Sequence, residues 1–238
     1  MEGFFERSEL LLGLDAMAKV RSARVILFGV GGVGSWCAEG LIRNGVGQLC
    51  IVDFDVVNPS NVNRQLEATS CTIGLSKVEC MRRRLLEINP KAQISAVERR
   101  FSAEYAGEFE LDSYDVIIDA IDSLNDKIAL LLAASRTGAK VFSSMGAALK
   151  MDPTRVRVAE FWQVRGCPLG AMLRKRMRQA GTLPEKEIVC VYDDEVLENK
   201  GLCAEGTRIN GSLVHITAIF GMTLCGLVIQ SLLELKAR

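Results

Sequence analysis

The sequence predicts a doubly wound α/β fold, with a mainly parallel sheet and helices on both faces, from three features near its start. Residues 25–28 form a short apolar run rich in branched side chains, which is typical of a buried parallel strand. A glycine-rich turn follows, and then a helix is expected over residues 33–44. A second expected strand, Gln48–Val52, ends in Asp53, nineteen residues after Gly34. This order of strand, glycine turn, helix and acidic strand end indicates a Rossmann-like nucleotide-binding core.

The glycine cluster predicts where the phosphates of a nucleotide lie. Glycines let the backbone bend sharply and let a phosphate approach N–H groups at the positive end of the helix dipole. The cluster comprises Gly29, Gly31, Gly32 and Gly34. Asp53 is then expected to accept a hydrogen bond from a ribose hydroxyl. The spacing is similar to a P-loop, but a Walker-type ATPase is not expected, because Ser35 occupies the place of the required lysine.

Length and charge limit the number of domains and the ways in which the chain could bind nucleic acid. A chain of 238 residues indicates one domain. Within it we expect an N-terminal helical arm at 1–23, a nucleotide-binding core at 24–161 and an extension at 162–238. The 29 basic residues balance 29 acidic ones, so the chain has no general attraction to nucleic acid. A polyanion would have to be held by a local patch.

The cysteines and the hydropathy of the sequence indicate its redox compartment and its relation to a membrane. The eight cysteines include no C-x-x-C pair, and no secretory signal is apparent, so free thiols in a reducing cytoplasm are expected. A four-cysteine zinc site is not expected. The apolar run 213–233 is long enough to span a membrane. His215, Gln230 and several small residues within it favour a buried C-terminal helix instead, without stable membrane association.

The N-terminal arm is expected to be helical. Leu10, Leu11, Leu14 and Met17 are spaced for one apolar face. Arg7 precedes that face, and spacing alone indicates a solvated arginine.

A polar loop follows the second strand and can surround a triphosphate. It carries Asn61, Asn63, Arg64 and Gln65. A helix is expected at Lys77–Ile88, with Ser76 as its cap and Glu79 completing a capping box. A cation at the start of a helix is unfavourable unless an anion lies nearby, so the position of Lys77 favours a phosphate contact.

The fourth expected strand, 114–119, ends in the segment Asp119-Ala120-Ile121-Asp122. Two carboxylates at the carboxyl end of a parallel strand suit magnesium coordination. The alternative is that Asp122 caps a following helix at 124–137. Spacing leaves both interpretations open.

The second half of the chain contributes further strands and a basic helix. Strands are expected at Gln93–Val97, Lys140–Ser144, 156–161 and 188–192. Small residues at 145–148 would let a substrate lie close to the backbone. A basic helix is expected at Pro168–Ala180, and residues 195–209 are interpreted as a mobile lid loop.

Four segments then occur together in a recognisable order: GVGGVGSWCAEGLIRNGVG, DFDVVNPSNVNRQ, GLSKVE and DAIDS. They resemble the ubiquitin-activating-enzyme superfamily of ThiF-type adenylating domains, whose bacterial members bind ATP and adenylylate a carboxylate. SSMGAALKMDPTRVRVAEF and CPLGAMLRKRMR resemble its tRNA threonylcarbamoyladenosine dehydratase branch. The sulfur-carrier adenylyltransferases usually carry paired C-x-x-C zinc ligands, which this sequence lacks.

The resemblance implies an enzyme that uses ATP and Mg²⁺. Its reaction would be the dehydration and ring closure of N6-threonylcarbamoyladenosine beside the anticodon of tRNA, by way of an acyl-adenylate. The resemblance assigns the four glycines to the nucleotide loop, Asp53 to the ribose and Asp55 to a place near the phosphates. It assigns Asp122 to magnesium and the following residues to the phosphate and catalytic set: Asn61, Arg64, Gln65 and Lys77.

The resemblance also implies partners. Arg7 matches an arginine that some members insert into the partner subunit's site, which implies a homodimer. The tRNA would be held through its phosphates by surface cations. The first candidates are Arg174, Lys175, Arg176 and Arg178, and the second are Arg82, Arg83 and Arg84. A solvated helix face is the alternative for either set.

The sequence departs from the superfamily pattern at its cysteines, and two rival functions remain open. Cys190 and Cys203 lie where some members use a cysteine for thioester or persulfide chemistry, but neither sits in an alignable motif, and filling a core is the alternative. His215 is expected to be structural. One rival function is an adenylyltransferase for the C-terminal glycine of a ubiquitin-like sulfur carrier, with a sulfur-relay partner. The other is a dehydrogenase that binds NAD.

Overall fold

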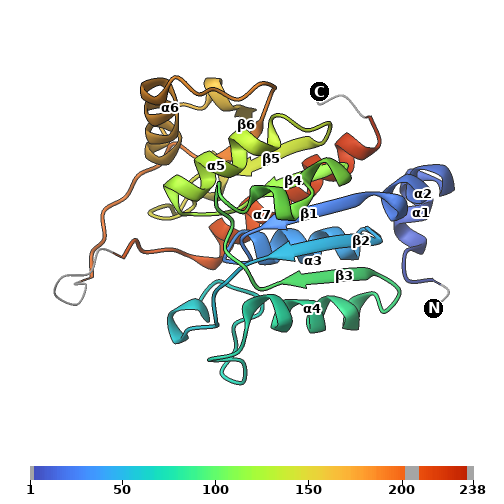
Figure 1. Ribbon diagram of the computed structural model, residues 1–238. Coiled ribbons are helices and arrows are strands. Elements are labelled where there is room, and N and C mark those ends of the chain that lie inside the picture. The colour runs from blue at the N-terminus through green and yellow to red at the C-terminus, as the bar shows by residue number, and fades with distance from the viewer. Residues whose placement is uncertain (1–2, 202–208, 235–238) are drawn as a thin grey trace.

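The computed structural model describes residues 3–201 and 209–234, with a seven-stranded sheet at its centre (Figure 1). The strand order is β3-β2-β1-β4-β5-β7-β6, and all neighbours are parallel except β6 and β7. The predicted doubly wound, mainly parallel sheet is therefore confirmed. The strands are β1 (Arg24–Phe28), β2 (Gln48–Val52), β3 (Gln93–Val97), β4 (Val116–Asp119), β5 (Lys140–Ser144), β6 (Arg157–Glu160) and β7 (Val189–Tyr192).

Helices cover both faces of the sheet because successive side chains of a buried strand point to opposite faces. In β1, Val25 and Leu27 join one hydrophobic core, whereas Ile26 and Phe28 join the other. The first core lies under α2 (Leu14–Ser22), α3 (Gly34–Arg43), α4 (Lys77–Ile88) and α7 (Val214–Leu232), and the second under α5 (Leu124–Ala134) and α6 (Pro168–Ala180). Short 3₁₀ helices occupy Pro59–Asn61, Ala106–Phe109, Leu111–Ser113, Pro153–Arg155 and Phe161–Gln163.

The C-terminal helix α7 packs closely on α3. A Cβ atom at Gly221 would lie 2.5 Å from the carbonyl oxygen of Val33, so a glycine is needed at this crossing. A stripe of α7 side chains is fully buried in the core: Ile216, Phe220, Leu224 and Val228. Among the described helices, α7 alone has the length and composition of a membrane span, a test that a core helix also passes. The predicted C-terminal helix is confirmed as a core element, although one side of it stays partly exposed.

The N-terminal arm forms two helices where the sequence predicts one amphipathic helix. Gly13, with φ +84°, separates α1 (Glu6–Leu12) from α2. Met17 is fully buried, but three leucines of the predicted apolar face are exposed: Leu10, Leu11 and Leu14. That prediction is wrong because the turn at Gly13 breaks the helical register that would align these leucines with Met17.

Two other predictions need correction. Ser76 stands at the N-cap of α4, but its hydroxyl has no hydrogen-bond partner among the described residues, and Glu79 pairs with Arg82 at 3.1 Å instead of completing a capping box. The sixth strand is shorter than predicted and runs antiparallel at the edge of the sheet. β7 comes later in the chain but is inserted between β5 and β6.

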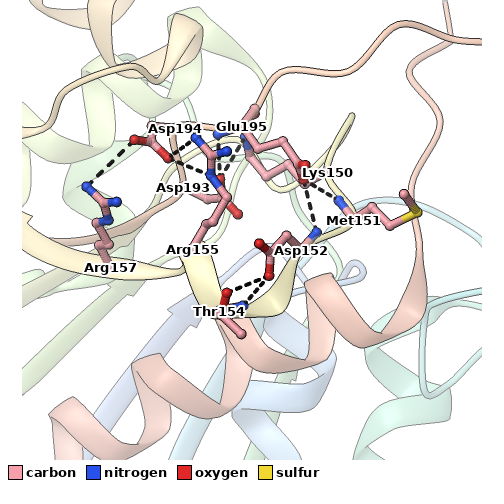
Figure 2. A network of polar contacts seen from close by, with 9 residues as sticks. All are labelled: Lys150, Met151, Asp152, Thr154, Arg155, Arg157, Asp193, Asp194 and Glu195. Carbon is pink, nitrogen blue, oxygen red and sulfur yellow. Dashed lines mark hydrogen bonds and ion pairs between the residues drawn. The ribbon is translucent and has the colours of Figure 1, made fainter.

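A polar network joins the β5–β6 connection to the segment after β7 (Figure 2). The Glu195 carboxylate accepts hydrogen bonds from the backbone N–H groups of 151–152, and the buried Lys150 donates to the Glu195 carbonyl oxygen. Arg155 donates twice to Asp194, at 2.9 and 3.1 Å. These contacts hold the chain where it leaves the sheet for the loop that precedes α7.

The lid loop predicted at 195–209 begins at this network. Its residues 202–208 lie outside the described structure. The two flanking segments are joined by Asn199. Its side chain donates to the carbonyl of Ile209 and accepts from the N–H of Gly211, both at 2.8 Å. Lid movement stays a prediction.

Candidate nucleotide site

A cleft of about 670 Å³ opens at the carboxyl edge of the sheet. Its floor is formed where β1, β2 and β4 end, at Phe28, Val52 and Ala120. From β1 the chain proceeds outward to β2 and β3 on one side, and from β4 to β5 on the other. The cleft therefore lies at the point where the strand order reverses, which is where doubly wound sheets bind ligands. Its volume is typical of sites for small molecules.

The glycine turn brings the ends of β1 and β4 into close contact. Gly29 has φ +89°, and a Cβ atom there would lie 2.6 Å from the carbonyl oxygen of Ala120. Gly31 and Gly32 line the cleft. Gly34 is the first residue of α3 and does not line the cleft, but a Cβ atom there would lie 1.8 Å from the Gly29 carbonyl oxygen. The turn therefore excludes side chains and leaves backbone groups facing the cleft.

Asp53 connects the end of β2 to the glycine turn. One carboxylate oxygen accepts a hydrogen bond from the N–H of Val30 at 2.7 Å, and the other accepts from the N–H of Asp55 at 2.9 Å. Burial raises the pKa of Asp53, although these two bonds and the nearby Lys77 ammonium oppose the rise. A carboxylate can accept about four hydrogen bonds, so Asp53 keeps acceptor capacity toward the cleft.

Lys77 reaches the cleft from the start of α4 and meets an anion of the protein itself. Its Nζ lies 2.9 Å from Oδ2 of Asp55, and both residues line the cleft. Only 5 % of Lys77 is exposed. The Asp55 carboxylate thus supplies the anion that the sequence pattern required at this helix start.

The polar loop places two of its predicted residues on the cleft wall. Arg64 and Gln65 line the cleft, and Oε1 of Gln65 is buried without a hydrogen-bond partner in the described part of the chain. Asn61 does not line the cleft. Its Oδ1 accepts from the N–H of Asn58 at 3.0 Å, and its carbonyl oxygen accepts from the N–H groups of Arg64 and Gln65. Asn61 therefore shapes the loop instead of facing a ligand.

At the end of β4, the two acidic residues have different environments. Asp119 is fully buried and forms an ion pair with Lys127, whose Nζ lies 2.7 Å from Oδ2. Ser143 also donates to Asp119, at 2.6 Å, so this carboxylate is engaged inside the protein. Asp122 is exposed and lines the cleft, whereas Ser123 occupies the N-cap of α5. Of these two acidic residues, Asp122 is therefore the one that can offer oxygen ligands to a metal in the cleft.

Other predicted residues lie outside the cleft. Arg7 is exposed on α1, which lies beyond the amino ends of the strands (Figure 1). On α6, Arg174 donates to the Phe161 carbonyl oxygen at 3.0 Å and is half-buried. The other three basic residues of the predicted set are exposed: Lys175, Arg176 and Arg178.

Several lining residues were missed by sequence reasoning. Arg99 and Arg100 follow the end of β3 and reach the cleft, and Arg100 pairs with Asp126 at 2.8 Å. Their position just after a strand end was the signal that could have revealed them. Thr217 of α7 also lines the cleft and would lie 3.2 Å from a Cβ atom at Gly32. No local pattern marks Thr217, because the approach of α7 depends on tertiary packing.

The described cysteines are free thiols, as predicted, and most of them are buried. Cys190 is fully buried in β7, and burial raises the pKa of its thiol far above the ordinary value. Such a thiol is a poor nucleophile at neutral pH. Cys203 lies outside the described residues. The lone histidine, His215, stands at the start of α7 with Nε2 3.0 Å from the carbonyl oxygen of Met151, consistent with a structural role.

Comparisons with known proteins agree with this geometry. A model of the ThiF family matches residues 5–237. A tRNA threonylcarbamoyladenosine dehydratase of Haemophilus influenzae is 32% identical over 94% of this chain and 90% of that protein. The enzyme of that name from Bacillus subtilis is 37% identical over 80% of this chain and 74% of its own length. The crystal structure of the Escherichia coli dehydratase TcdA in complex with ATP superposes with a TM-score of 0.88, at 30% identity, covering 97% of this chain and 93% of that one.

The burial of Cys190 leads to a testable prediction about thiol reactivity. In native protein treated with iodoacetamide, the exposed Cys71 should be alkylated at least about 100-fold faster than Cys190, because the thiolate is the reactive form and must be accessible. Peptide mass spectrometry after timed quenching measures both rates, and protein unfolded in urea is the control in which both thiols should react. Comparable rates in native protein would contradict the inert role of Cys190.

Proposed function

The chain belongs to the ThiF family, in its tRNA threonylcarbamoyladenosine dehydratase branch, and from this membership we propose that it binds ATP and dehydrates N6-threonylcarbamoyladenosine beside the anticodon of tRNA. The single observation that supports this most is the composition of the cleft at the switch point. It combines a glycine turn, an acidic strand end, and a lysine and an arginine on one wall. We propose that the whole chain acts as one adenylating domain.

The cleft fits ATP in three respects. The turn at Gly29 excludes side chains from the approach of a phosphate. The acceptor capacity left on Asp53 suits a ribose hydroxyl. The buried Oε1 of Gln65, which has no partner among the described residues, suits a donor group of a bound molecule, because an unsatisfied buried acceptor is costly.

The first chemical step would be attack of the substrate carboxylate on the α-phosphate, with release of pyrophosphate. The nucleophile is already ionised at neutral pH, so the step needs neutralisation of charge more than it needs a strong base. Arg64 and Lys77 would stabilise the negative charge that develops on the phosphate. The Lys77 ammonium group would act most strongly, because it is buried and little water screens it.

The second step would close a ring. A nitrogen of the substrate side chain attacks the acyl carbon of the adenylate and displaces AMP, so the modified base loses one water overall. Because this reaction is intramolecular, it needs positioning but no enzyme nucleophile. The buried Cys190 agrees with that scheme.

A magnesium ion would enter with the nucleotide. Mg²⁺ commonly binds through one or two carboxylates together with substrate phosphates, and it neutralises phosphate charge. Asp122, exposed on the cleft wall, fits that role. No group of three or more metal-ligating side chains occurs in the part of the chain that the structure describes, so the phosphates would supply the other ligands.

A second copy of the chain would complete the site. Arg7 lies on α1, beyond the amino ends of the strands, whereas the cleft opens at their carboxyl ends (Figure 1). We propose that the chain forms a homodimer in which Arg7 of one subunit enters the cleft of the other.

The tRNA would contact α6. Lys175, Arg176 and Arg178 are exposed there, and the positive charges of Arg165 and Arg178 add to burial in lowering the pKa of Arg174, so the surface is crowded with cations. The second candidate set, on α4, is less available for phosphate contacts, because Arg82 and Arg84 form ion pairs with Glu79 and Glu39. We also propose a cytoplasmic setting, which the free thiols fit.

The proposed activity predicts a mass change in tRNA nucleosides. With threonylcarbamoylated tRNA and MgATP, the protein should produce a nucleoside lighter by one water, and AMP should appear in equal amount. Arg64→Ala or Lys77→Ala should lower the rate at least about 100-fold, because each removes a charge that stabilises the transition state. Nucleoside mass spectrometry measures both results.

The matched control is Arg43→Ala, which removes an arginine outside the cleft and should keep the rate. Full activity of both cleft variants would contradict the assignment. Pyrophosphate exchange driven by a ubiquitin-like sulfur carrier, and not by tRNA, would instead support the rival adenylyltransferase.

The proposed dimer predicts complementation between inactive variants. Arg7→Ala and Lys77→Ala should each be inactive alone. Mixed after dissociation and reassociation, they should recover about a quarter of the wild-type rate, since half of randomly formed dimers are mixed and each holds one complete site. A mixture of Arg64→Ala and Lys77→Ala should recover nothing, because both changes fall in the same cleft. No recovery in the first mixture would contradict the shared site.

The assignment of α6 predicts weaker and less salt-dependent binding of tRNA. Replacing Arg174, Lys175, Arg176 and Arg178 with alanine should reduce the slope of log K against log salt by about two to three units. Each lost phosphate contact contributes just under one unit, and three of the four cations are exposed, since Arg174 is half-buried and donates to the Phe161 carbonyl oxygen. ATP affinity should stay unchanged, and Arg43→Ala, on α3 and in neither candidate set, serves as the control. Electrophoretic or fluorescence titration at several salt concentrations measures the slope, and an unchanged slope would exclude α6 as the contact.

A further inference from the structure

Glu67 is a buried carboxyl group that the proposed chemistry does not use. Only 3 % of the residue is exposed. Neither of its side-chain oxygens has a hydrogen-bond partner among residues 3–201 and 209–234. Burying an ionised carboxylate in this way is expensive, so an ordinary structural role does not explain it.

Glu67 lies directly behind the wall of the cleft. It follows Arg64 and Gln65, which line the cleft, and the same segment is fixed to the first turns of α3. Trp36 donates to the Arg64 carbonyl oxygen at 3.1 Å, and the N–H of Leu66 donates to Oγ of Ser35 at 3.2 Å. A change in the charge of Glu67 therefore occurs beside a rigidly held part of the site.

The charged groups around Glu67 include the cleft lysine. Lys77 attracts the charged form of Glu67, and Asp53 repels it. The Ser35 hydroxyl, from α3, also favours the charged form. From α4, Cys80 and Arg84 interact with the same carboxyl, but Arg84 is engaged by Glu39.

Burial dominates these effects and raises the pKa of Glu67 to about 8. Glu67 is then uncharged at neutral pH, and Lys77 faces two charged carboxylates, Asp53 and Asp55. At a pH above that pKa, Glu67 adds a third negative charge that interacts with the Lys77 ammonium group, beside those of Asp53 and Asp55. The extra negative charge opposes the entry of a triphosphate into the same place.

We propose that Glu67 is a positioning residue for the cleft lysine: it stays uncharged while the nucleotide is bound, and its ionisation draws Lys77 away from the phosphates. This inference rests on the proposed binding of ATP by the cleft. It makes the protonation of Glu67 and the binding of ATP thermodynamically linked, so each must favour the other to the same extent.

The linkage predicts a pH dependence of ATP affinity. Since the uncharged form binds, the dissociation constant of MgATP should rise about tenfold between pH 7 and pH 9, as the competent fraction falls to about a tenth. Glu67→Gln, which cannot ionise, should change less than about twofold over that range. Glu79→Gln, which removes a half-buried carboxylate of α4 that pairs with Arg82, should follow the wild-type profile. Titration calorimetry at constant ionic strength measures all three.

A second measurement needs no variant. In protein labelled with ¹³C at glutamate side chains, one carboxyl signal should titrate with a midpoint near pH 8. Saturating MgATP should move that midpoint upward by about two units or more, because a tenfold change in affinity between pH 7 and pH 9 requires a shift of that size. A midpoint that ATP does not move, or a Glu67→Gln profile identical to the wild type, would overturn the inference. Absence of ATP binding by the wild type at pH 7 would instead overturn the proposed function.

Discussion

The close contact between the ends of β1 and β4 is the constraint on which the rest of the site depends. Gly29 turns against Ala120 with no room for a side chain, and its N–H donates to the Val52 carbonyl oxygen at 2.8 Å. The ends of β1, β2 and β4 are thereby fixed at one point. Because parallel strands all present their carboxyl ends at the same edge, the polar residues that follow each strand gather around this contact.

Buried polar groups hold that arrangement from behind. Lys127 bridges Asp119 and the Ile121 carbonyl oxygen, at 2.7 and 2.9 Å, and so fixes the segment that presents Asp122 to the cleft. Removing one partner of a fully buried ion pair typically costs about 3–5 kcal/mol, because the other charge is left without compensation. This ion pair therefore fixes the chain behind the cleft and, with it, the position of the segment that presents Asp122.

The charge of Lys77 in the cleft is balanced by the protein itself. Lys77 already pairs with Asp55, so a triphosphate would exchange one anionic partner for another and would not meet a bare cation. Glu67 lies behind this pair, and its burial outweighs the Lys77 ammonium and the Ser35 hydroxyl, which favour its charged form. In the proposed linkage, the attraction of Lys77 for phosphate depends on the protonation of this carboxyl group, which does not line the cleft.

The sequence by itself determined most of the elements and located the glycine turn, the polar loop and the acidic strand ends of the cleft. Gln48–Val52, Lys77–Ile88 and Pro168–Ala180 have the bounds that local patterns predict, because each carries its own periodicity, although the capping box predicted for Lys77–Ile88 does not form. The predicted strand ends also placed Asp53 and Asp122 at the cleft. Ligands of parallel sheets bind at the carboxyl ends of the strands, so the position of a residue just after a strand is enough to predict this. Tertiary structure alone decided the insertion of β7 beside β5, the engagement of Asp119 by Lys127 and the approach of Thr217 to the glycine turn. Each of these depends on which distant segments meet, and a local pattern carries no information about that.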